Sequence, residues 1–567
     1  MKREKCDLVI KNAKIFNVFT GETEEGDLAV KNGKIVGTGN DYEAETVYDG
    51  AGLTALPGFI DSHIHIESST LSPEEFAAFS VAHGTSVVVA DPHEITNVCG
   101  VAGAEYIKEA VSRLRVGEVC PLEVCLQLPS CVPATPFETS GAVIDGRETE
   151  EEMKKEIFFG LGEMMGFPAV IGGDGDTLRK IEAAHACGKV VDGHAPAVSG
   201  DALNAYACAG IRTDHECVNA EDCREKLRRG LYIQLRNGSS AHNIEENSKA
   251  MNAYNYRRFI LCSDDRNAYS LSSSGELDDG LRRLVASGIP AAQAVAAATL
   301  NAADCYGLKG KGALAPSYDA DVVLVENLKD FNVRAVFKKG VLVAENGKPC
   351  FAHDKRYLPA AVTSSVRIKP VTADDFRLDL NGKVRVMRVR PNGIMTEEEI
   401  VSVTSHGGDV VLGEDLLKMA VVERHFATGN MGKCLLKGYG LKGGAIGITV
   451  AHDSHNMVIL GDDNAAMARV AQLLVDAGGG MALAAGEKED VFPFDIAGLM
   501  SSAPVDEVLS RTKEITEEAK QMGVIDGIEP FMTLVFLSLA VIPKLRLTDK
   551  GLVDVDKFEI VPLEIEG

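Results

Sequence analysis

Positive charge is scarce in this chain. Its 567 residues include 58 lysines and arginines against 83 aspartates and glutamates, which gives a net charge of −25. Such a chain repels phosphate groups, and this argues against nucleic-acid partners and against an anionic membrane surface. Long apolar runs are also missing, because the most apolar one, residues 531–542, is too short to span a bilayer and ends at Pro543.

Paired cysteine motifs and a secretion signal are lacking as well. None of the thirteen cysteines forms a Cys-x-x-Cys pair, and several, such as Cys187, Cys208 and Cys262, stand in apolar segments. This pattern is typical of reduced, buried thiols in a cytoplasmic protein. The first five residues lead into strand-like sequence and not into the apolar core of a signal peptide. We therefore expect a soluble, cytoplasmic protein.

Short strand patterns occur at both flanks of a long central segment. Residues 6–50 alternate in strand fashion, with a hairpin signal at Asn32-Gly33. Similar strands return at 320–325 and 333–343. We expect residues 1–55 and 312–358 to meet in one small β-sandwich, so that the ends of the intervening segment lie close together.

The central segment, residues 56–311, alternates strand-like and helix-like patterns, which is typical of β/α units around a parallel sheet. Its size and its eight strand candidates predict the α/β fold class and a (β/α)8 TIM barrel. The candidate strands are 58–65, 85–91, 122–128, 157–163, 189–194, 211–215, 231–236 and 259–264.

The first of these strands carries His63-Ile64-His65. Alternation puts Asp61, His63, His65 and, if the strand continues, Glu67 on one face. Two neighbouring imidazoles suit one divalent cation of the zinc or manganese type, although a His-rich strand end without metal is the simpler alternative.

Acids and imidazoles also follow other candidate strands, where a barrel of this class places its chemistry. The strand ends carry His63 and His65, then Asp91 to Glu94, then Glu163, His194, Asp214 to Glu216, and Ser263 to Asp265. A barrel used only as a scaffold has no reason for such residues at six of eight strand ends, so the joint pattern predicts a metal centre.

This order of ligand-type residues, together with the flanking sandwich, resembles the amidohydrolase superfamily. Longer motifs narrow the resemblance to the bacterial adenine deaminase family, and this resemblance covers essentially the whole chain. These motifs are Pro57–Ser69, His83–Ile95, Gly162–Met165, Asp453–Asn456, Ile496–Ser501, Val541–Pro543 and Leu547–Leu552.

The resemblance implies a binuclear site with two divalent metal ions, Mn²⁺ first and Fe²⁺ or Zn²⁺ as alternatives. His63 and His65 would hold one ion with Asp264, and His194 and His215 would hold the other. Glu163 would bridge them, where many relatives use a carbamylated lysine. The implied assembly is a homodimer or larger.

The implied reaction is the hydrolytic deamination of adenine to hypoxanthine and ammonia, in which a metal-activated hydroxide adds to C6. Asp264 would carry the proton towards the leaving amine. Glu67, His93 and Glu94 would bind or protonate ring nitrogens, or would only support the ligands. Supporting roles are favoured for Asp214 and Glu216.

In residues 360–567, strand-like runs alternate with amphipathic helical patterns, and we expect a separate α+β domain. Its candidate chemistry is His452-Asp453-Ser454-His455, for which a cap over the barrel or a subunit contact is favoured over a metal or nucleophile role.

Two alternative functions stay open. One is another amidohydrolase activity, such as amide or cyclic-amide hydrolysis or the deacetylation of an N-acetyl-amino sugar. The other is a non-catalytic barrel.

Overall fold

The computed structural model describes residues 5–39, 41–239 and 242–565. The chain divides into two compact units. The first comprises Met1–Pro92, Glu105–Cys131 and Asp145–Tyr357, and the second comprises His93–Ala104, Val132–Ile144 and Leu358–Gly567. The three-domain division expected from the sequence stays a prediction.

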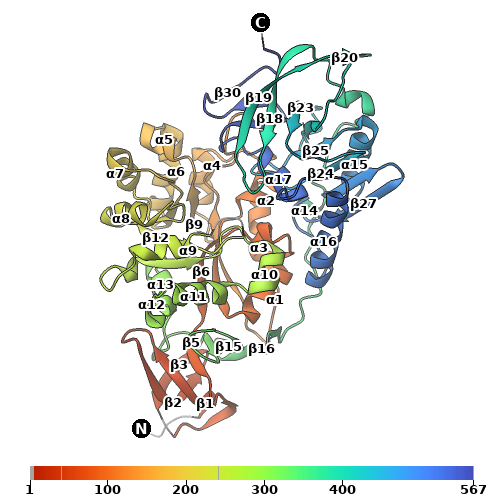
Figure 1. Cartoon of the computed structure of the whole chain (residues 1–567). Helices are drawn as coiled ribbons and strands as arrows, with labels where there is room; N and C mark the ends of the chain where they lie inside the picture. Colours follow the sequence, from red (N-terminus) through yellow and green to blue (C-terminus); the bar gives the residue numbers. More distant parts are fainter. Residues whose placement is uncertain (1–4, 40, 240–241, 566–567) are drawn as a thin grey trace. The chain divides into compact units, whose positions relative to one another are not determined.

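In the first unit, strands from both flanks of its sequence share one nine-stranded sheet. The sheet order is β17-β16-β15-β14-β5-β1-β2-β3, with β4 paired to β1 (Figure 1). Leu8, Leu28, Val322 and Phe337 meet in its core, and β2 and β3 form the predicted hairpin around Asn32-Gly33. The strands are β1 (Cys6–Asn17), β2 (Glu22–Lys31), β3 (Lys34–Gly39), β4 (Ala44–Asp49), β5 (Thr54–Pro57), β14 (Val322–Val325), β15 (Val333–Lys338), β16 (Val341–Glu345) and β17 (Lys348–Pro349).

Between these flanks lie two parallel sheets, with strand orders β10-β9-β8-β7-β6 and β11-β12-β13. Their strands are buried on both faces, as in the Val-rich β7, where all six residues are buried. The strands are β6 (Phe59–Ile64), β7 (Thr85–Ala90), β8 (Glu123–Leu128), β9 (Phe158–Met164), β10 (Val190–Gly193), β11 (Thr213–Asp214), β12 (Tyr232–Arg236) and β13 (Phe259–Cys262). Each lies within or close to a predicted range; their closure into one barrel stays a prediction.

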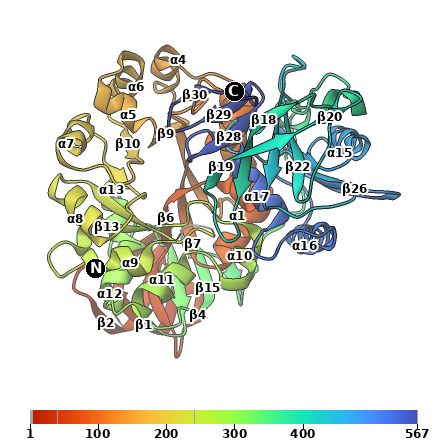
Figure 2. The same cartoon turned by 45° about the horizontal axis from the view of Figure 1, so that its top comes forward.

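Helices follow these strands and cover them. Helix α1 begins at a serine cap, because the Ser72 hydroxyl accepts the backbone N–H of Glu75 at 3.3 Å. Helices α5, α6 and α7 lie on the outer side of β9 and β10 (Figure 2), and α8 packs against β12. The helices are α1 (Pro73–Ala82), α3 (Val101–Ser112), α4 (Gly146–Glu152), α5 (Phe167–Gly172), α6 (Gly175–Ala186), α7 (Gly200–Cys208), α8 (Ala220–Arg228), α9 (Ile244–Asn247), α10 (Ala268–Ser274), α11 (Leu277–Ala286), α12 (Ala291–Ala297) and α13 (Leu300–Tyr306).

The second unit contains an eight-stranded sheet in the order β19-β18-β23-β22-β25-β24-β26-β27. Met467, Val470 and Leu474 of α15 pack with its buried residues Val422 and Ile459. Its strands are β18 (Gly382–Val389), β19 (Thr396–Val403), β22 (Leu416–Val422), β23 (Met431–Lys437), β24 (Ala445–Ile448), β25 (Met457–Gly461), β26 (Gly480–Ala485) and β27 (Lys488–Pro493). Its helices include α2 (His93–Cys99), α14 (Ala360–Thr363), α15 (Asn464–Asp476), α16 (Val505–Gln521) and α17 (Pro530–Leu537).

Two smaller sheets complete the second unit. They are the pair β20 (Ser405–His406) and β21 (Asp409–Val410), and the three strands β28 (Leu545–Thr548), β29 (Gly551–Asp554) and β30 (Glu559–Ile560).

Among the helices in the described part of the chain, none has the length and apolar character that crossing a membrane requires.

Candidate metal centre

The six predicted metal ligands come together in the first unit at the carboxyl ends of five strands. His63 lies in β6 and Glu163 in β9, while His65, His194, His215 and Asp264 follow β6, β10, β11 and β13. Side-chain donors of these residues form three overlapping groups whose ligand atoms lie within 4.8 Å of one another. The groups are His63, His215 and Asp264; His63, His65 and Glu163; and Glu163, His194 and His215.

His63 and His65 turn their Nε2 atoms towards a common point. Their Nε2 atoms are 3.1 Å apart. The Nδ1–H of His65 donates to the Asp91 carbonyl at 2.8 Å, so in its neutral form this ring carries the lone pair on Nε2. Burial, with help from His215, lowers the pKa of His63 to about 3. Burial would also lower the pKa of His65, but Asp264 and Glu163 outweigh it and raise this pKa well above its usual range. Divalent cations bind neutral imidazoles, so a bound ion would take the place of the His65 proton.

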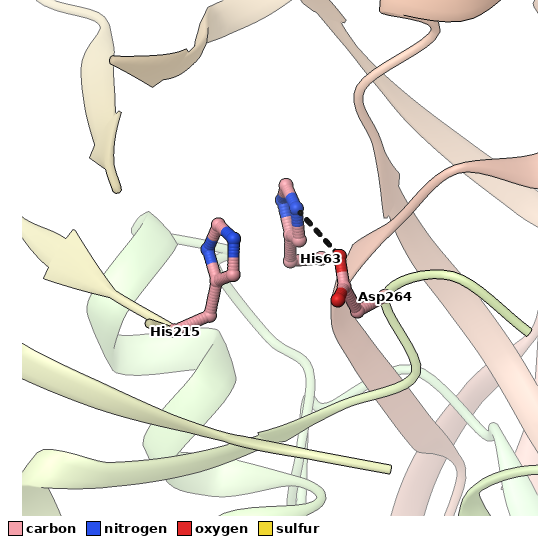
Figure 3. Close-up of side chains that lie close together, drawn as sticks. All are labelled: His63, His215 and Asp264. Atoms are coloured by element: carbon pink, nitrogen blue, oxygen red, sulfur yellow. Dashed lines mark ion pairs between the residues drawn. The ribbon is translucent and has the colours of Figure 1, made fainter. Parts of the chain in front are cut away.

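Asp264 joins this pair from β13. Its Oδ1 lies 3.6 Å from the His63 Nε2 and 3.2 Å from the His65 Nε2. Figure 3 shows the carboxylate beside His63, whose ring stacks on that of His215 at a centroid distance of 4.4 Å. The Asp264 N–H donates to the His63 carbonyl at 2.9 Å, and its φ of 57° is left-handed. The backbone thus holds an unusual conformation at a ligand position, as functional sites often do.

Glu163 faces a different histidine group with each carboxylate oxygen. Its Oε1 lies 3.3 Å from the His65 Nε2. Its Oε2 lies 2.6 Å from the His194 Nδ1 and 3.1 Å from the His215 Nε2. Burial would raise the pKa of Glu163, but His215 and His194 outweigh it and hold the pKa well below its usual range. The Asp91 carboxylate accepts the Glu163 backbone N–H at 2.7 Å and so steadies this residue.

Arg236, at the end of β12, was not among the predicted site residues. Its Nη1 donates to the Asp264 Oδ2 at 3.0 Å and also contacts Glu216. Glu216 in turn lies 3.7 Å from the His215 Nε2. Burial would raise the pKa of Asp264, but Arg236 outweighs it and keeps Asp264 ionised. Arg236 ends a predicted strand, but nothing in the sequence pairs it with Asp264.

The predicted substrate-binding residues are all buried. Glu67 lies in a short 3-10 turn, Ile66–Ser69, that follows β6. His93 and Glu94 open α2 in the second unit, with the His93 Nε2 3.3 Å from the Glu94 Oε1. Glu94 also pairs with His452 and His455. Their contact with a substrate stays a prediction. Of the flanking acids, Asp214 pairs with the buried Lys226 at 3.0 Å, and its supporting role stays a prediction.

Imidazole and carboxylate donors converge here, and this donor set fits divalent metal ions of the manganese, iron or zinc type. The fit rests on the converging Nε2 atoms of His63 and His65 and on the ionised Glu163 and Asp264. The first unit therefore contains candidate metal sites.

Comparison with known proteins shows the family to which this chain belongs. Residues 54–343 match the amidohydrolase family, and residues 393–559 match the adenine deaminase C-terminal domain. Adenine deaminase 2 of Desulfotalea psychrophila is 44% identical over 568 residues, which covers 99% of this chain and 97% of that protein. The chain belongs to the adenine deaminase family of amidohydrolases.

Other members of the adenine deaminase family are similarly close. Adenine deaminase of Nitratidesulfovibrio vulgaris is 44% identical over 569 residues, which covers 99% of this chain and 97% of that protein. The Clostridium acetobutylicum protein is 41% identical and covers 98% of both chains. Among solved structures, an enamidase of the amidohydrolase superfamily matches with a TM-score of 0.45 and 16% identity, over 60% of this chain and 96% of that one.

Proposed function

We propose that this protein catalyses the hydrolytic deamination of adenine to hypoxanthine and ammonia. The observation that supports this most strongly is that two features occur together. Glu163 presents each of its oxygens to a different histidine group, and relatives named adenine deaminase align over 98–99% of the chain. The first feature suits hydrolysis by a metal-activated water, and the second indicates the substrate.

The proposed cofactors are two divalent metal ions, most simply Mn²⁺. His63, His65 and Asp264 would hold one, His194 and His215 the other, and Glu163 would bridge them. When bound, such ions lower the pKa of a water molecule and so supply a nucleophile at neutral pH. The ligand distances support this division, because the Glu163 Oε1 faces His65 and its Oε2 faces His194 and His215.

We assign proton transfer to Asp264. Its Oδ1 faces the metal-binding histidines, and its Oδ2 is held by Arg236. A carboxylate fixed in this way can accept a proton from water at one oxygen and deliver it to the departing amine. The reaction needs this, because the exocyclic amine leaves readily only after protonation.

Adenine itself is neutral and planar, so in-plane hydrogen bonds should recognise it. We propose Glu67, His93 and Glu94 for this task. Glu94 follows the end of β7 at Ala90 by only four residues, a chain length of at most about 14 Å. Buried carboxyl and imidazole groups near a strand end are suited to bind ring nitrogens, although support of the metal ligands is an alternative role for them.

Fold, assembly and location complete the proposal. We infer that the two parallel sheets close into one barrel, and two junction hydrogen bonds support this: Arg212 N–H to the Val191 carbonyl and Asp264 N–H to the His63 carbonyl, both 2.9 Å. The domains would be a β-sandwich (1–55 and 312–358), the barrel (56–311) and a C-terminal α+β domain (360–567). We further propose a homo-oligomer in the cytoplasm, where the thirteen cysteines would stay reduced. Cys262 is buried as predicted, whereas the predicted burial of Cys187 and Cys208 is wrong, since both are exposed.

The test is adenine turnover by purified protein. Conversion to hypoxanthine changes the ultraviolet spectrum, and elemental analysis of the same sample should find close to two transition-metal ions per chain. Chelation should abolish turnover, and added Mn²⁺ should restore it. Hydrolysis of a cyclic amide or an N-acetyl-amino sugar in place of adenine would refute the assignment, and a folded protein that binds no metal would refute the mechanism.

A further inference from the structure

A cluster of histidines surrounds Glu94 inside the second unit, and none of its members is one of the six proposed metal ligands. The Glu94 Oε1 lies 2.5 Å from the His452 Nδ1 and 3.3 Å from the His93 Nε2. Its Oε2 contacts the His455 Nε2. Glu94 and His455 are 2% and 1% exposed. Two of these histidines come from the loop between β24 and β25, the motif His452–His455 that the catalytic assignment left without a role.

Glu94, His452 and His455 could in principle hold a metal ion, but the protonation of His455 argues for hydrogen bonding. The Ala451 backbone N–H donates to the His455 Nδ1 at 3.0 Å, so this nitrogen must be bare. In a neutral ring the proton then sits on Nε2, the atom that faces Glu94. A metal ion on Nε2 would require a ring that has lost both protons. Burial lowers the pKa of His455 to about 4, consistent with a neutral donor.

The loop that carries His455 is itself firmly held. The buried Arg424 guanidinium donates to the His455 carbonyl, and the Nε2–H of His425 donates to the Ser454 carbonyl at 2.7 Å. The Asn456 amide donates to the Thr139 carbonyl at 2.8 Å. These partners also hold His455 at a left-handed φ of 54°, a conformation that few residues other than glycine adopt. A strained residue with so many constraints can fix the direction of its ring.

We propose that His455 is a positioning residue that holds the Glu94 carboxylate in the orientation required for adenine deamination, through a hydrogen bond from its Nε2–H. This inference rests on the proposed role of Glu94 at the substrate. His452 approaches the other oxygen, so both oxygens of Glu94 are held. A carboxylate restrained at both oxygens loses little conformational freedom when it binds a ring nitrogen, which favours catalysis.

The matched variants are His455→Gln and His455→Asn. The glutamine amide reaches about as far as Nε2 and can still donate to Glu94, while the asparagine amide reaches only the Nδ1 position near Ala451. Asparagine is the better residue for a left-handed φ, so a purely structural role of His455 predicts that the glutamine variant is the poorer enzyme. A positioning role predicts the opposite order.

We expect His455→Asn to lower kcat for adenine about 10- to 100-fold at unchanged metal content, the scale of one lost hydrogen bond to a charged group. His455→Gln should recover most of this loss. In a Glu94→Gln background His455→Asn should have less than about a twofold further effect, because it acts through Glu94. The exposed His406, changed to asparagine, serves as the control and should leave kcat unchanged.

Several results would overturn the inference. They are a wild-type kcat in His455→Asn, and a kcat in the glutamine variant no higher than in the asparagine variant. A further loss of kcat in the Glu94→Gln background equal to that in the wild type would also overturn it, as would a loss of kcat explained by a loss of bound metal. Wild-type turnover in Glu94→Gln would refute the proposed roles of both Glu94 and His455. It would leave the proposed adenine deamination intact. Failure of the wild-type protein to convert adenine would refute the proposed function and this inference with it.

Discussion

Replacement of Asp264 by asparagine tests the proposed proton transfer with little disturbance of the structure. Asparagine has the same shape and is one of the few residues that tolerate the left-handed φ of 57° found here. Its backbone N–H can still donate to the His63 carbonyl. Its side-chain oxygen can still face His63 and His65. The change therefore removes a charge and a proton acceptor, and keeps the conformation.

The size of the expected loss follows from the role of Asp264. A positioned general acid–base contributes about 10²- to 10⁴-fold to a rate, equivalent to about 3–5 kcal/mol in the activation free energy. The amide cannot accept the proton, so most of this contribution should disappear from kcat. Because Arg236 keeps its contact with Glu216, we expect the surrounding ion pairs to stay in place.

The assay is adenine conversion, followed by ultraviolet absorbance, with metal content measured on the same sample. The expected result is a kcat lowered at least about 100-fold in protein that still holds its metal ions. Near-normal turnover in the metal-loaded variant would remove Asp264 from proton transfer. A loss that disappears when excess Mn²⁺ is added would make Asp264 a metal ligand only.

Three further predictions concern neighbouring groups. Glu163→Gln should lower metal content and abolish turnover, since an amide cannot bridge two cations through two anionic oxygens; unchanged metal content by elemental analysis would contradict the bridge. Arg236→Met should cost about 3 kcal/mol of unfolding stability in metal-depleted protein, because Asp264 and Glu216 lose their buried partner, while Arg236→Lys should cost less; equal denaturation midpoints would refute this. Burial, reinforced by Asp453, raises the pKa of Glu138 from 4.5 to about 7. The folded state therefore binds the proton more tightly, and stability should fall by up to about 3 kcal/mol as the pH rises from about 4.5 to 7; Glu138→Gln should flatten this fall, and an unchanged slope would contradict it.

Much of the site could be predicted because strand patterns carry positional information. A parallel strand is followed by its functional residues, and neighbouring strands end at the same edge of a sheet. His63, His65 and Glu163 could therefore be grouped without coordinates. Arg236 could not, because its significance lies in one contact, with the Asp264 Oδ2, and not in its residue type.

The sequence by itself indicated the family through motifs that resemble adenine deaminases, and local alternation predicted the strands of the central segment. Strand ends and the same resemblance predicted the candidate metal-binding side chains. Only the tertiary structure decided which oxygen of Glu163 faces which histidine, that Arg236 holds Asp264, and that His455 meets Glu94, 361 residues away along the chain. The physical reason is that hydrogen bonds between distant side chains depend on the packing of whole elements, and packing leaves no periodic signal in the sequence.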